Sequence, residues 1–326
     1  MNMQHIDYVL TLAKERSFSK AAERLFMTQS ALSQYIRKQE QQLGVTLFNR
    51  TNNPITLTPE GELYVQALQK VKMDMLDFER QLTDLTELRT GKLILGTSAF
   101  RATNLLPRVI KDFTSLYPGI TLEIITENIN HLKEGLASEE IDFCIETDYF
   151  EKDLFHCETI YTETHYLAIP KNHPLNHVLG EENTLTAEDI GNESEHFFNA
   201  NPVSLERCGE EKMIGVKSGN SFYKCHSDMY HEAGIKPNFI ISVDNIETAF
   251  RWVDIGIAIS ILPDSLILHG NFKEHPNYYK LDLLTANQNI VFAMRNGRYV
   301  STATKKFLDI LRQLIGFGTW NMPLQS

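Results

Sequence analysis

The sequence of 326 residues lacks the features that mark membrane-spanning and secreted proteins. No apolar run reaches the roughly 18 residues that a membrane span needs. The first residues, Met1 to His5, have neither the basic patch nor the apolar core of a signal peptide. We therefore expect a cytoplasmic protein, and this length allows about two domains of roughly 150 residues each.

Cysteine is scarce, and its spacing does not suggest a metal site. Cys144, Cys157, Cys208 and Cys225 show no CxxC or His/Cys ligand spacing, so we predict no disulfide framework, no metal site and no cofactor. Cys144 lies in an apolar run and is expected to be a small core residue. Cys208 and Cys225 lie in more polar surroundings, and a redox pair of these two stays open as an alternative.

A catalytic constellation is also missing. The 11 histidines are scattered, and no Ser/His/Asp or paired-carboxylate spacing stands out. We predict no catalytic residues and no enzyme activity. The rival interpretation, a two-lobed solute-binding protein or enzyme, would require a signal peptide or a catalytic constellation.

A net charge of −11 would argue against binding to nucleic acid if the charge were evenly spread. Residues 1–58, however, hold seven Lys or Arg and four Asp or Glu, a net of +3. The remainder of the chain therefore carries −14. A small basic head on an acidic body is compatible with DNA binding by the head.

The stretch from Ser17 to Arg50 predicts two helices joined by a tight corner. Ser19 can cap the first helix, Phe26 and Met27 form the corner, and Thr28 can cap the second helix. Small alanines in the first helix allow close approach of the second, as a helix-turn-helix requires. The apolar positions of the two helices are Ala21, Ala22, Leu25, Ala31, Leu32, Tyr35, Ile36 and Leu43.

The opposite face of the second helix carries amides, hydroxyls and cations, the groups that reach base edges and phosphates. These residues are Gln29, Ser30, Ser33, Gln34, Arg37 and Lys38. Gly44 would end the helix, and residues 45–48 and 55–57 would form two short strands of a wing in which Arg50 meets phosphate. An ordinary αα-hairpin with a merely solvated polar face is the alternative.

A long helix follows, starting at Thr58-Pro59-Glu60 and reaching about Arg89. Its apolar residues recur at steps of four and three, which is a heptad seam. A partner helix from a second subunit is the expected cover, and an intrachain bundle is the alternative. The seam consists of Tyr64, Leu68, Val71, Met75, Phe78, Leu82 and Leu85.

From Gly91 onwards, strands alternate with helices, the rhythm of a parallel sheet. We predict two α/β lobes, each with a parallel sheet, and a strand at 196–199. Residues 180–215 have weak periodicity, so their secondary structure is the hardest to predict. Ligands of such folds lie at the carboxyl ends of the strands. Polar residues at these positions, any of which could be a plain helix cap or a solvated side chain, are Thr97, Ser98, Arg101, Thr147, Ser218, Asn220 and Ser221.

These residues, taken together, resemble the LysR-type transcriptional regulators over nearly the whole chain. Weaker matches follow in the second part, ending with the stretch 256–263. The strongest matches are Ser17-Phe18, Ala21-Ala22, Leu25, Gln29 to Ser33, Ile36, Glu40, Leu43-Gly44, Leu47-Phe48, Arg50, Leu57-Thr58 and Gly61.

The resemblance implies a multidomain fold: a winged helix-turn-helix at 1–58, a dimerising linker helix at 59–90, and a two-lobed α/β effector domain similar to the type 2 periplasmic binding proteins. Lobe one would comprise 91–168 and 265–326, and lobe two 169–264. The family implies a homodimer or homotetramer, double-stranded promoter DNA, a small and often anionic effector, and contact with RNA polymerase.

The resemblance also implies roles by position. The DNA-binding face would include Ser19. It would also include four residues that face bases: Gln29, Ser30, Ser33 and Gln34. Thr28, Arg37, Lys38 and Arg50 would meet phosphates, and the strand-end residues given above would line the effector cleft. Gln34 departs from the arginine common in the family and suggests a preference for adenine. Thiol oxidation in place of metabolite sensing stays open as a rival.

Overall fold

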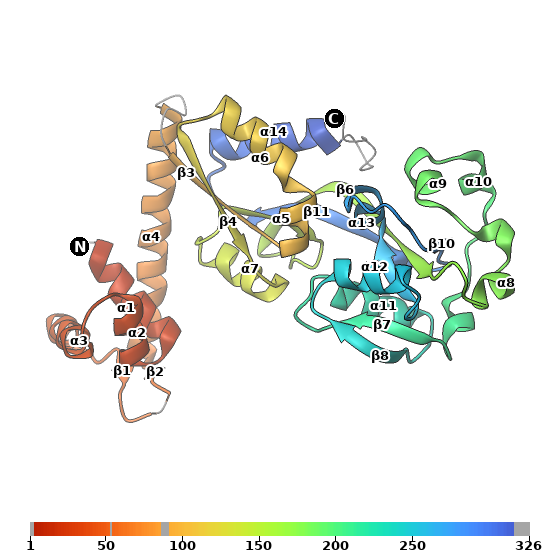
Figure 1. Cartoon of the computed structure of the whole chain (residues 1–326). Coiled ribbons are helices and arrows are strands. Elements are labelled where there is room, and N and C mark those ends of the chain that lie inside the picture. Colours follow the sequence, from red (N-terminus) through yellow and green to blue (C-terminus); the bar gives the residue numbers. More distant parts are fainter. Residues whose placement is uncertain (1–2, 53, 86–90, 316–326) are drawn as a thin grey trace. The chain divides into compact units, whose positions relative to one another are not determined.

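The computed structural model describes residues 3–52, 54–85 and 91–315. The chain divides into two compact units, Met1–Leu85 and Thr86–Ser326. Figure 1 shows the helices and strands of each unit. Among the described residues, no helix is both long enough and apolar enough to cross a membrane.

The first unit is a helical head with a two-stranded wing. Its core is formed by apolar residues of every helix, including Val9, Leu32 and Ile36, all fully buried. Strands β1 and β2 pair antiparallel, as the sequence predicted for a wing. The elements are α1 (Met3–Glu15), α2 (Phe18–Arg24), α3 (Gln29–Leu43), β1 (Phe48–Asn49), β2 (Thr56–Leu57) and α4 (Pro59–Leu85).

Helix α4 begins where the sequence predicted. The hydroxyl of Thr58 accepts a hydrogen bond from Gly61 N at 2.9 Å, and Gly61 is needed because a side chain there would collide with the carbonyl of Leu47. An ion pair joins α1 to the middle of α4, where Lys72 Nζ lies 2.9 Å from Asp7 Oδ1. The helix ends at Leu85, and its predicted continuation to Arg89 lies outside the described residues.

The described residues of the heptad seam of α4 differ in burial along the helix. Leu68 is buried and Tyr64 half-buried against the head. Further along, the exposed fractions are 39% for Val71, 38% for Met75, 51% for Phe78 and 44% for Leu82. Four large apolar residues on one stripe of a helix are therefore exposed to solvent in the single chain.

The second unit starts with a lobe built around parallel strands. β3 pairs parallel with both β4 and β5, which confirms the alternation read from the sequence. Helix α14 (Thr302–Ile315) packs against α6 on this lobe (Figure 1). The rings of Phe113 and Phe307 meet between these two helices. The elements are β3 (Gly91–Thr97), α5 (Ala99–Asn104), α6 (Leu106–Leu116), β4 (Ile120–Thr126), α7 (Ile129–Ala137), β5 (Phe143–Thr147) and β6 (Phe155–Ile169).

The next lobe has its own core of buried apolar residues. The strand predicted at 196–199 is wrong, because Ser194 caps a short helix there, and strand β7 was missed. The elements are α8 (Leu175–Leu179), η1 (Glu181–Asn183), α9 (Ala187–Asn192), α10 (Glu195–Asn199), η2 (Leu205–Cys208), β7 (Lys212–Val216), α11 (Tyr223–Glu232), β8 (Asn238–Val243), α12 (Ile246–Asp254), β9 (Ser260–Pro263), α13 (Asp264–His269), β10 (Asn277–Lys280) and η3 (Leu284–Ala286).

Strand β6 belongs to both lobes. Its first part pairs antiparallel with β11 (Asn287–Arg295). From His165 onwards it pairs antiparallel with β9, and from Tyr166 to Ile169 it also pairs antiparallel with β10. The sheet that contains β6 is therefore mixed rather than parallel. In the second lobe, β7 and β8 form a parallel pair, and Met213 of β7 makes a further parallel bridge to Ile259. Helix α14 (Thr302–Ile315) completes the first lobe.

The segment after the predicted boundary at residue 265 packs first with the second lobe. Leu266, Tyr278 and Leu281 lie in the core of the second lobe, because β10 pairs with the end of β6. The first lobe resumes at β11, whose Ile290 and Phe292 lie in the core of that lobe.

Candidate functional site

The two helices of the head meet at a strained corner. Phe26 has a φ of +52°, a conformation uncommon for a bulky residue, and its side chain is 98% exposed. Thr28 then caps α3 by accepting from Ala31 N at 3.2 Å, and Gly44 ends the helix at φ +72°. The cap of α2 is Ser17, not Ser19 as predicted. Ser19 lies exposed in the first turn of α2 instead.

One face of α3 is polar and exposed, as the spacing predicted. Leu32 and Ile36 are buried on the opposite side, and Tyr35 is half-buried. Ala31 and Leu43 are exposed, although the sequence placed them on the apolar face. The exposed polar residues are Thr28, Gln29, Ser30, Gln34, Arg37 and Lys38.

Arg50 joins the wing to α3. Its Nη2 lies 2.6 Å from Glu40 Oε2, its Nη1 donates to the hydroxyl of half-buried Ser33 at 3.4 Å, and its guanidinium lies 5.2 Å from the ring centre of Phe18. Glu40 also accepts from the backbone N–H groups that open the wing. The charge of Arg50 is therefore already paired within the head.

In the α/β unit, a cavity of about 470 Å³ lies where several strands give way to helices. Ser98, Asn128 and Asn245 cap helices α5, α7 and α12 at its wall. The loop Gly219–Ser221 forms another part, and Glu127, Asp244 and Glu247 add carboxylates. A second cavity of about 370 Å³ shares Asn128 and this loop and is also lined by Ser218, Tyr149, Lys224 and Asp228.

The predicted cleft residues fall into two groups. Ser98, Ser218, Asn220 and Ser221 line these cavities. Thr97, Arg101 and Thr147 are buried and line neither cavity. The sequence could not separate the groups, because both occupy the ends of strands.

Arg101 is the centre of a buried ionic network. Its Nη2 lies 3.0 Å from Glu163 Oε2 and donates to Thr147 Oγ1 at 3.0 Å. Its Nη1 lies 3.5 Å from Glu146 Oε1, an ion pair without hydrogen-bond geometry. Burial opposes the charge, but Glu146 and Glu163 outweigh it and raise the pKa of Arg101. Arg101 is therefore a structural cation in this structure rather than a cavity residue.

The carboxylate of Glu146 occupies an anion site made by the protein itself. It accepts hydrogen bonds from Ser98 N at 3.0 Å, Thr147 N at 2.9 Å and Thr147 Oγ1 at 3.3 Å. Converging N–H groups, a hydroxyl and a nearby guanidinium are what a bound anion would use. The side chain of Glu146 already fills that role.

Asp264, the first residue of α13, adds another buried carboxyl. Burial, followed by the charge of Glu163, raises the pKa of Asp264 to about 8. Its Oδ2 accepts from Thr164 N at 3.0 Å. Asp264 is therefore mainly protonated at neutral pH.

Comparison with known proteins identifies both units. Residues 3–62 match the family described as "Bacterial regulatory helix-turn-helix protein, lysR family", and residues 86–316 match the "LysR substrate binding domain". The chain belongs to the LysR family.

Relatives and solved structures agree with this LysR assignment. The HTH-type transcriptional regulator YcgK of Bacillus subtilis is 27% identical, over 96% of this chain and 94% of the relative. AlsR, an HTH-type regulator of the same organism, is 25% identical over 95% of each chain. Full-length OxyR of Pseudomonas aeruginosa shares the fold, with a TM-score of 0.65, 21% identity and coverage of 100% of this chain and 98% of that one.

This chain is thus a LysR-type DNA-binding transcriptional regulator whose second unit responds to a small-molecule effector. Its relatives are transcriptional regulators and not enzymes. The wall of the cavity also contains five residues that were not predicted from the sequence: Glu127, Asn128, Asp244, Asn245 and Glu247. The rule that found Ser98, a polar residue between a strand and a helix, also fits Asn128 and Asn245.

The thiols of this LysR-type regulator do not resemble oxidation sensors. Burial raises the pKa of Cys208 to about 12, and burial also raises the pKa of Cys225. A reactive thiol needs a depressed pKa and exposure, whereas Cys208 and Cys225 are 0% and 1% exposed. Burial and raised pKa values therefore argue against a redox pair of Cys208 and Cys225, the alternative that the sequence left open.

Proposed function

We propose that α3 enters the major groove of promoter DNA and that Gln29, Ser30 and Gln34 face base edges. An amide can both donate and accept, which suits a bidentate contact with adenine. Thr28, Arg37 and Lys38 flank this row and carry the groups that bind phosphates. The exposure of these six side chains on one face of α3 supports the proposal.

The roles of Ser19, Ser33 and Arg50 differ from those of the exposed row. Arg50 is held by Glu40 and Ser33, so its main effect is to fix the wing against α3. A phosphate would have to compete with Glu40 for the guanidinium. Ser19 is exposed at the start of α2 and is placed for a peripheral backbone contact.

The exposed half of the α4 seam supports a homodimer through α4. A heptad seam needs a facing helix to bury its apolar residues. Within the part of the chain that the structure describes, Val71, Met75, Phe78 and Leu82 remain 38–51% exposed. The homotetramer and the contact with RNA polymerase rest on the family alone. Promoter binding would place the regulator in the cytoplasm.

For the effector, we propose a neutral polar or cationic small molecule in the cavity at Ser98 and Asn220, in place of the anion that the family suggests. The main observation behind this proposal is that the backbone N–H groups of Ser98 and Thr147, which could bind an anion, already donate to the carboxylate of Glu146. No Lys or Arg is found among the residues that line this cavity.

Charge magnitudes support this choice. A helix N-terminus is equivalent to roughly +0.5 of a charge, so α7 and α12 together supply about +1. Asp244 is paired with Lys217 Nζ at 2.9 Å. Glu127 Oε2 lies 3.1 Å from His131 Nδ1, a contact that offsets the charge of Glu127 only when His131 is protonated, and Glu247 Oε1 accepts a hydrogen bond from the neutral amide of Asn104 at 3.2 Å. With His131 neutral, Glu127 and Glu247 carry two negative charges against about one positive charge from the helices, so the wall favours a cation over an anion.

A matched panel tests the charge of the effector. Thermal unfolding of the full chain would be measured with a four-carbon dicarboxylate, its diamide and its diamine, and with larger molecules bearing the same groups. We expect stabilisation by amines or amides, and Glu247→Gln should weaken an amine by about tenfold, or about 1.4 kcal/mol. Glu274→Gln, an exposed change outside the cavities, is the control.

Stabilisation by dicarboxylates alone would contradict the proposed ligand class. Tighter binding of a carboxylate after Glu247→Gln with no loss for amines would contradict it as well. Neither result would affect the assignment of α3 to DNA binding.

A further inference from the structure

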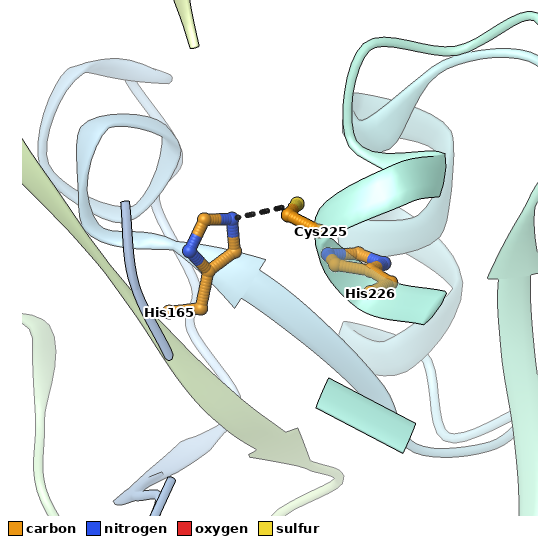
Figure 2. A group of neighbouring side chains, drawn as sticks. All are labelled: His165, Cys225 and His226. Carbon is orange, nitrogen blue, oxygen red and sulfur yellow. Dashed lines mark hydrogen bonds between the residues drawn. The ribbon is translucent and has the colours of Figure 1, made fainter. Parts of the chain in front are cut away.

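Three buried side chains of the second lobe bring soft donor atoms together (Figure 2). His165 lies on β6, and Cys225 and His226 lie on α11. Their exposed fractions are 0%, 1% and 4%. One ligand atom from each residue lies within 4.8 Å of the other two. Imidazole nitrogen and cysteine sulfur are the ligands that zinc and copper(I) prefer.

His165 is oriented as a metal-binding histidine would be. Its Nδ1 lies 3.3 Å from the carbonyl oxygen of Ala286. A carbonyl only accepts, so this contact places the ring proton on Nδ1 and leaves a lone pair on Nε2. Metal-binding histidines usually donate their second N–H to a carbonyl or carboxylate in this way.

The lone pair of His165 meets Cys225 at a distance that suits a metal. Nε2 and Sγ are 3.7 Å apart. With metal–nitrogen and metal–sulfur bonds of about 2.0 and 2.3 Å, the two donors of one ion lie about 3.6 Å apart. This pair therefore needs almost no movement to hold an ion.

His226 supplies the third ligand and an unexplained polar atom. Its Nε2 is buried and has no hydrogen-bond partner among the described residues. A buried polar atom is normally paired. Simple packing of His226 against Phe222, with ring centres 6.1 Å apart, accounts for the ring but not for this nitrogen.

We propose that His165, Cys225 and His226 bind a single d¹⁰ metal ion, Zn²⁺ or Cu⁺. The Cys225 thiol, now 3.0 Å from the Phe222 carbonyl, releases its proton to solvent and binds as a thiolate. The ion and its thiolate then carry +1 with Zn²⁺ or zero with Cu⁺. Three ligands suit trigonal Cu⁺, or Zn²⁺ with a fourth position for water.

The site has a route of entry. A cavity of about 300 Å³ has His226, Tyr223 and Tyr230 in its wall. An ion that enters this cavity meets His226 first. The donor atoms of the three residues lie within 4.8 Å of one another. The longest of these distances must shorten by about 1 Å before one ion can bind all three atoms.

The position of the three ligands suggests what the ion does. Thr164 pairs with Asn287 of β11, whereas His165 pairs with Pro263 of β9, so His165 stands where β6 passes from one lobe to the other. On α11, Tyr223 and Ser227 line the second cavity of about 370 Å³, which shares Asn128 and the loop Gly219–Ser221 with the cavity assigned to the effector. A bound ion would link α11 to β6, the strand that passes between the lobes. It would thereby alter the position of α11 beside the effector cavity.

The test uses the full chain, reduced and freed of metal with a chelator under anaerobic conditions. Zn²⁺ and Cu⁺ are titrated in separate arms against competing chelators, and Co²⁺ serves as a spectroscopic probe for thiolate ligation. Cys225→Ser and His226→Gln remove ligands. Cys208→Ser is the matched control, because Cys208 is another buried cysteine of the same core.

We expect one equivalent of Zn²⁺ or Cu⁺, a thiolate-to-metal absorption band with Co²⁺, and a higher melting temperature with the metal bound. Mutation of a residue that only orients a metal ligand typically lowers metal affinity by about 10–100-fold. Because Cys225 is itself a proposed ligand, Cys225→Ser should lower the affinity by at least about 100-fold. Cys208→Ser should bind like the wild type and keep the absorption band.

Two results would overturn the site. One is the absence of stoichiometric binding of either ion to the wild-type chain. The other is an unchanged affinity and unchanged Co²⁺ spectrum in Cys225→Ser. If Cys225→Ser does not fold, the Co²⁺ spectra of the wild type and of Cys208→Ser still decide, because a missing thiolate band in both refutes the proposal.

Discussion

Glu146→Ala tests whether an internal carboxylate occupies the anion site of the effector domain. The substitution removes the acceptor of the N–H groups of Ser98 and Thr147. It also leaves Arg101 with Glu163 as its remaining carboxylate in an ion pair. The side chain of Glu146 is 2% exposed, so water does not already compensate for it.

The expected loss follows from these contacts. An unsatisfied buried N–H costs about 1–3 kcal/mol, and removing one partner of a buried ion pair costs about 3–5 kcal/mol. The two costs are not additive, because water that enters the vacated space can hydrate the N–H groups of Ser98 and Thr147 and the guanidinium of Arg101 together. We expect the free energy of unfolding to fall by about 3–5 kcal/mol.

Acetate provides the specific assay, because it can replace the missing carboxylate. The free energy of unfolding would be measured by denaturant titration with and without acetate, at constant ionic strength. At ten times its Kd, acetate should restore about 1.4 kcal/mol to Glu146→Ala and nothing to the wild type. Glu127→Ala, an exposed carboxylate of the cavity rim, should change stability by less than about 1 kcal/mol.

A loss below about 1 kcal/mol for Glu146→Ala would refute the reasoning. So would equal effects of acetate on the variant and on the wild type. Either outcome would show that the N–H groups at Ser98 and Thr147 do not depend on an anion, and the argument against an anionic effector would then lose its main support.

Two further predictions concern Asp264 and the seam of α4. The raised pKa of Asp264, about 8 in the folded state against about 3.9 unfolded, gives stability that is present below about pH 4 and is lost as the pH rises to about 8. Between pH 5 and 7, denaturant titrations should therefore show the wild type losing about 1 kcal/mol per pH unit relative to Asp264→Asn; parallel profiles would contradict this. Phe78→Glu, on the exposed seam, should convert the proposed dimer to monomers in light-scattering measurements, whereas Gln81→Glu, an exposed neighbour, should not. An unchanged mass for Phe78→Glu would contradict dimerisation through this seam.

The sequence predicted the head well because its signals are local. The apolar spacing of Leu32 and Ile36, the caps Thr28 and Gly44, and the start of α4 at Thr58 all depend on residues a few positions apart. The cap of α2 was misplaced because Ser17 and Ser19 are two residues apart and both carry a hydroxyl. Only the packing of Phe18 and Ala21 towards the core distinguishes them.

The effector domain was harder to predict because its site depends on contacts between distant residues. Arg101 and Glu163 are 62 positions apart, and neither spacing nor composition indicates that they pair in the core. The same reason hid the cluster of His165, Cys225 and His226, for which the adjacent Cys225 and His226 were the only local signal. The crossing of β6 between lobes also depends on pairing with β11 and β9, and the paired residues are more than ninety positions apart in the sequence.

The most direct test of the central claim, that the exposed face of α3 reads DNA, compares Gln34→Ala with Lys38→Ala. Binding to the DNA upstream of the regulator's own gene and to random DNA would be measured by fluorescence anisotropy at several salt concentrations. Gln34→Ala should reduce the discrimination between the two DNAs by about 1–3 kcal/mol, and Lys38→Ala should weaken both equally and lower the salt slope by about one. Equal losses on both DNAs for Gln34→Ala would contradict the account.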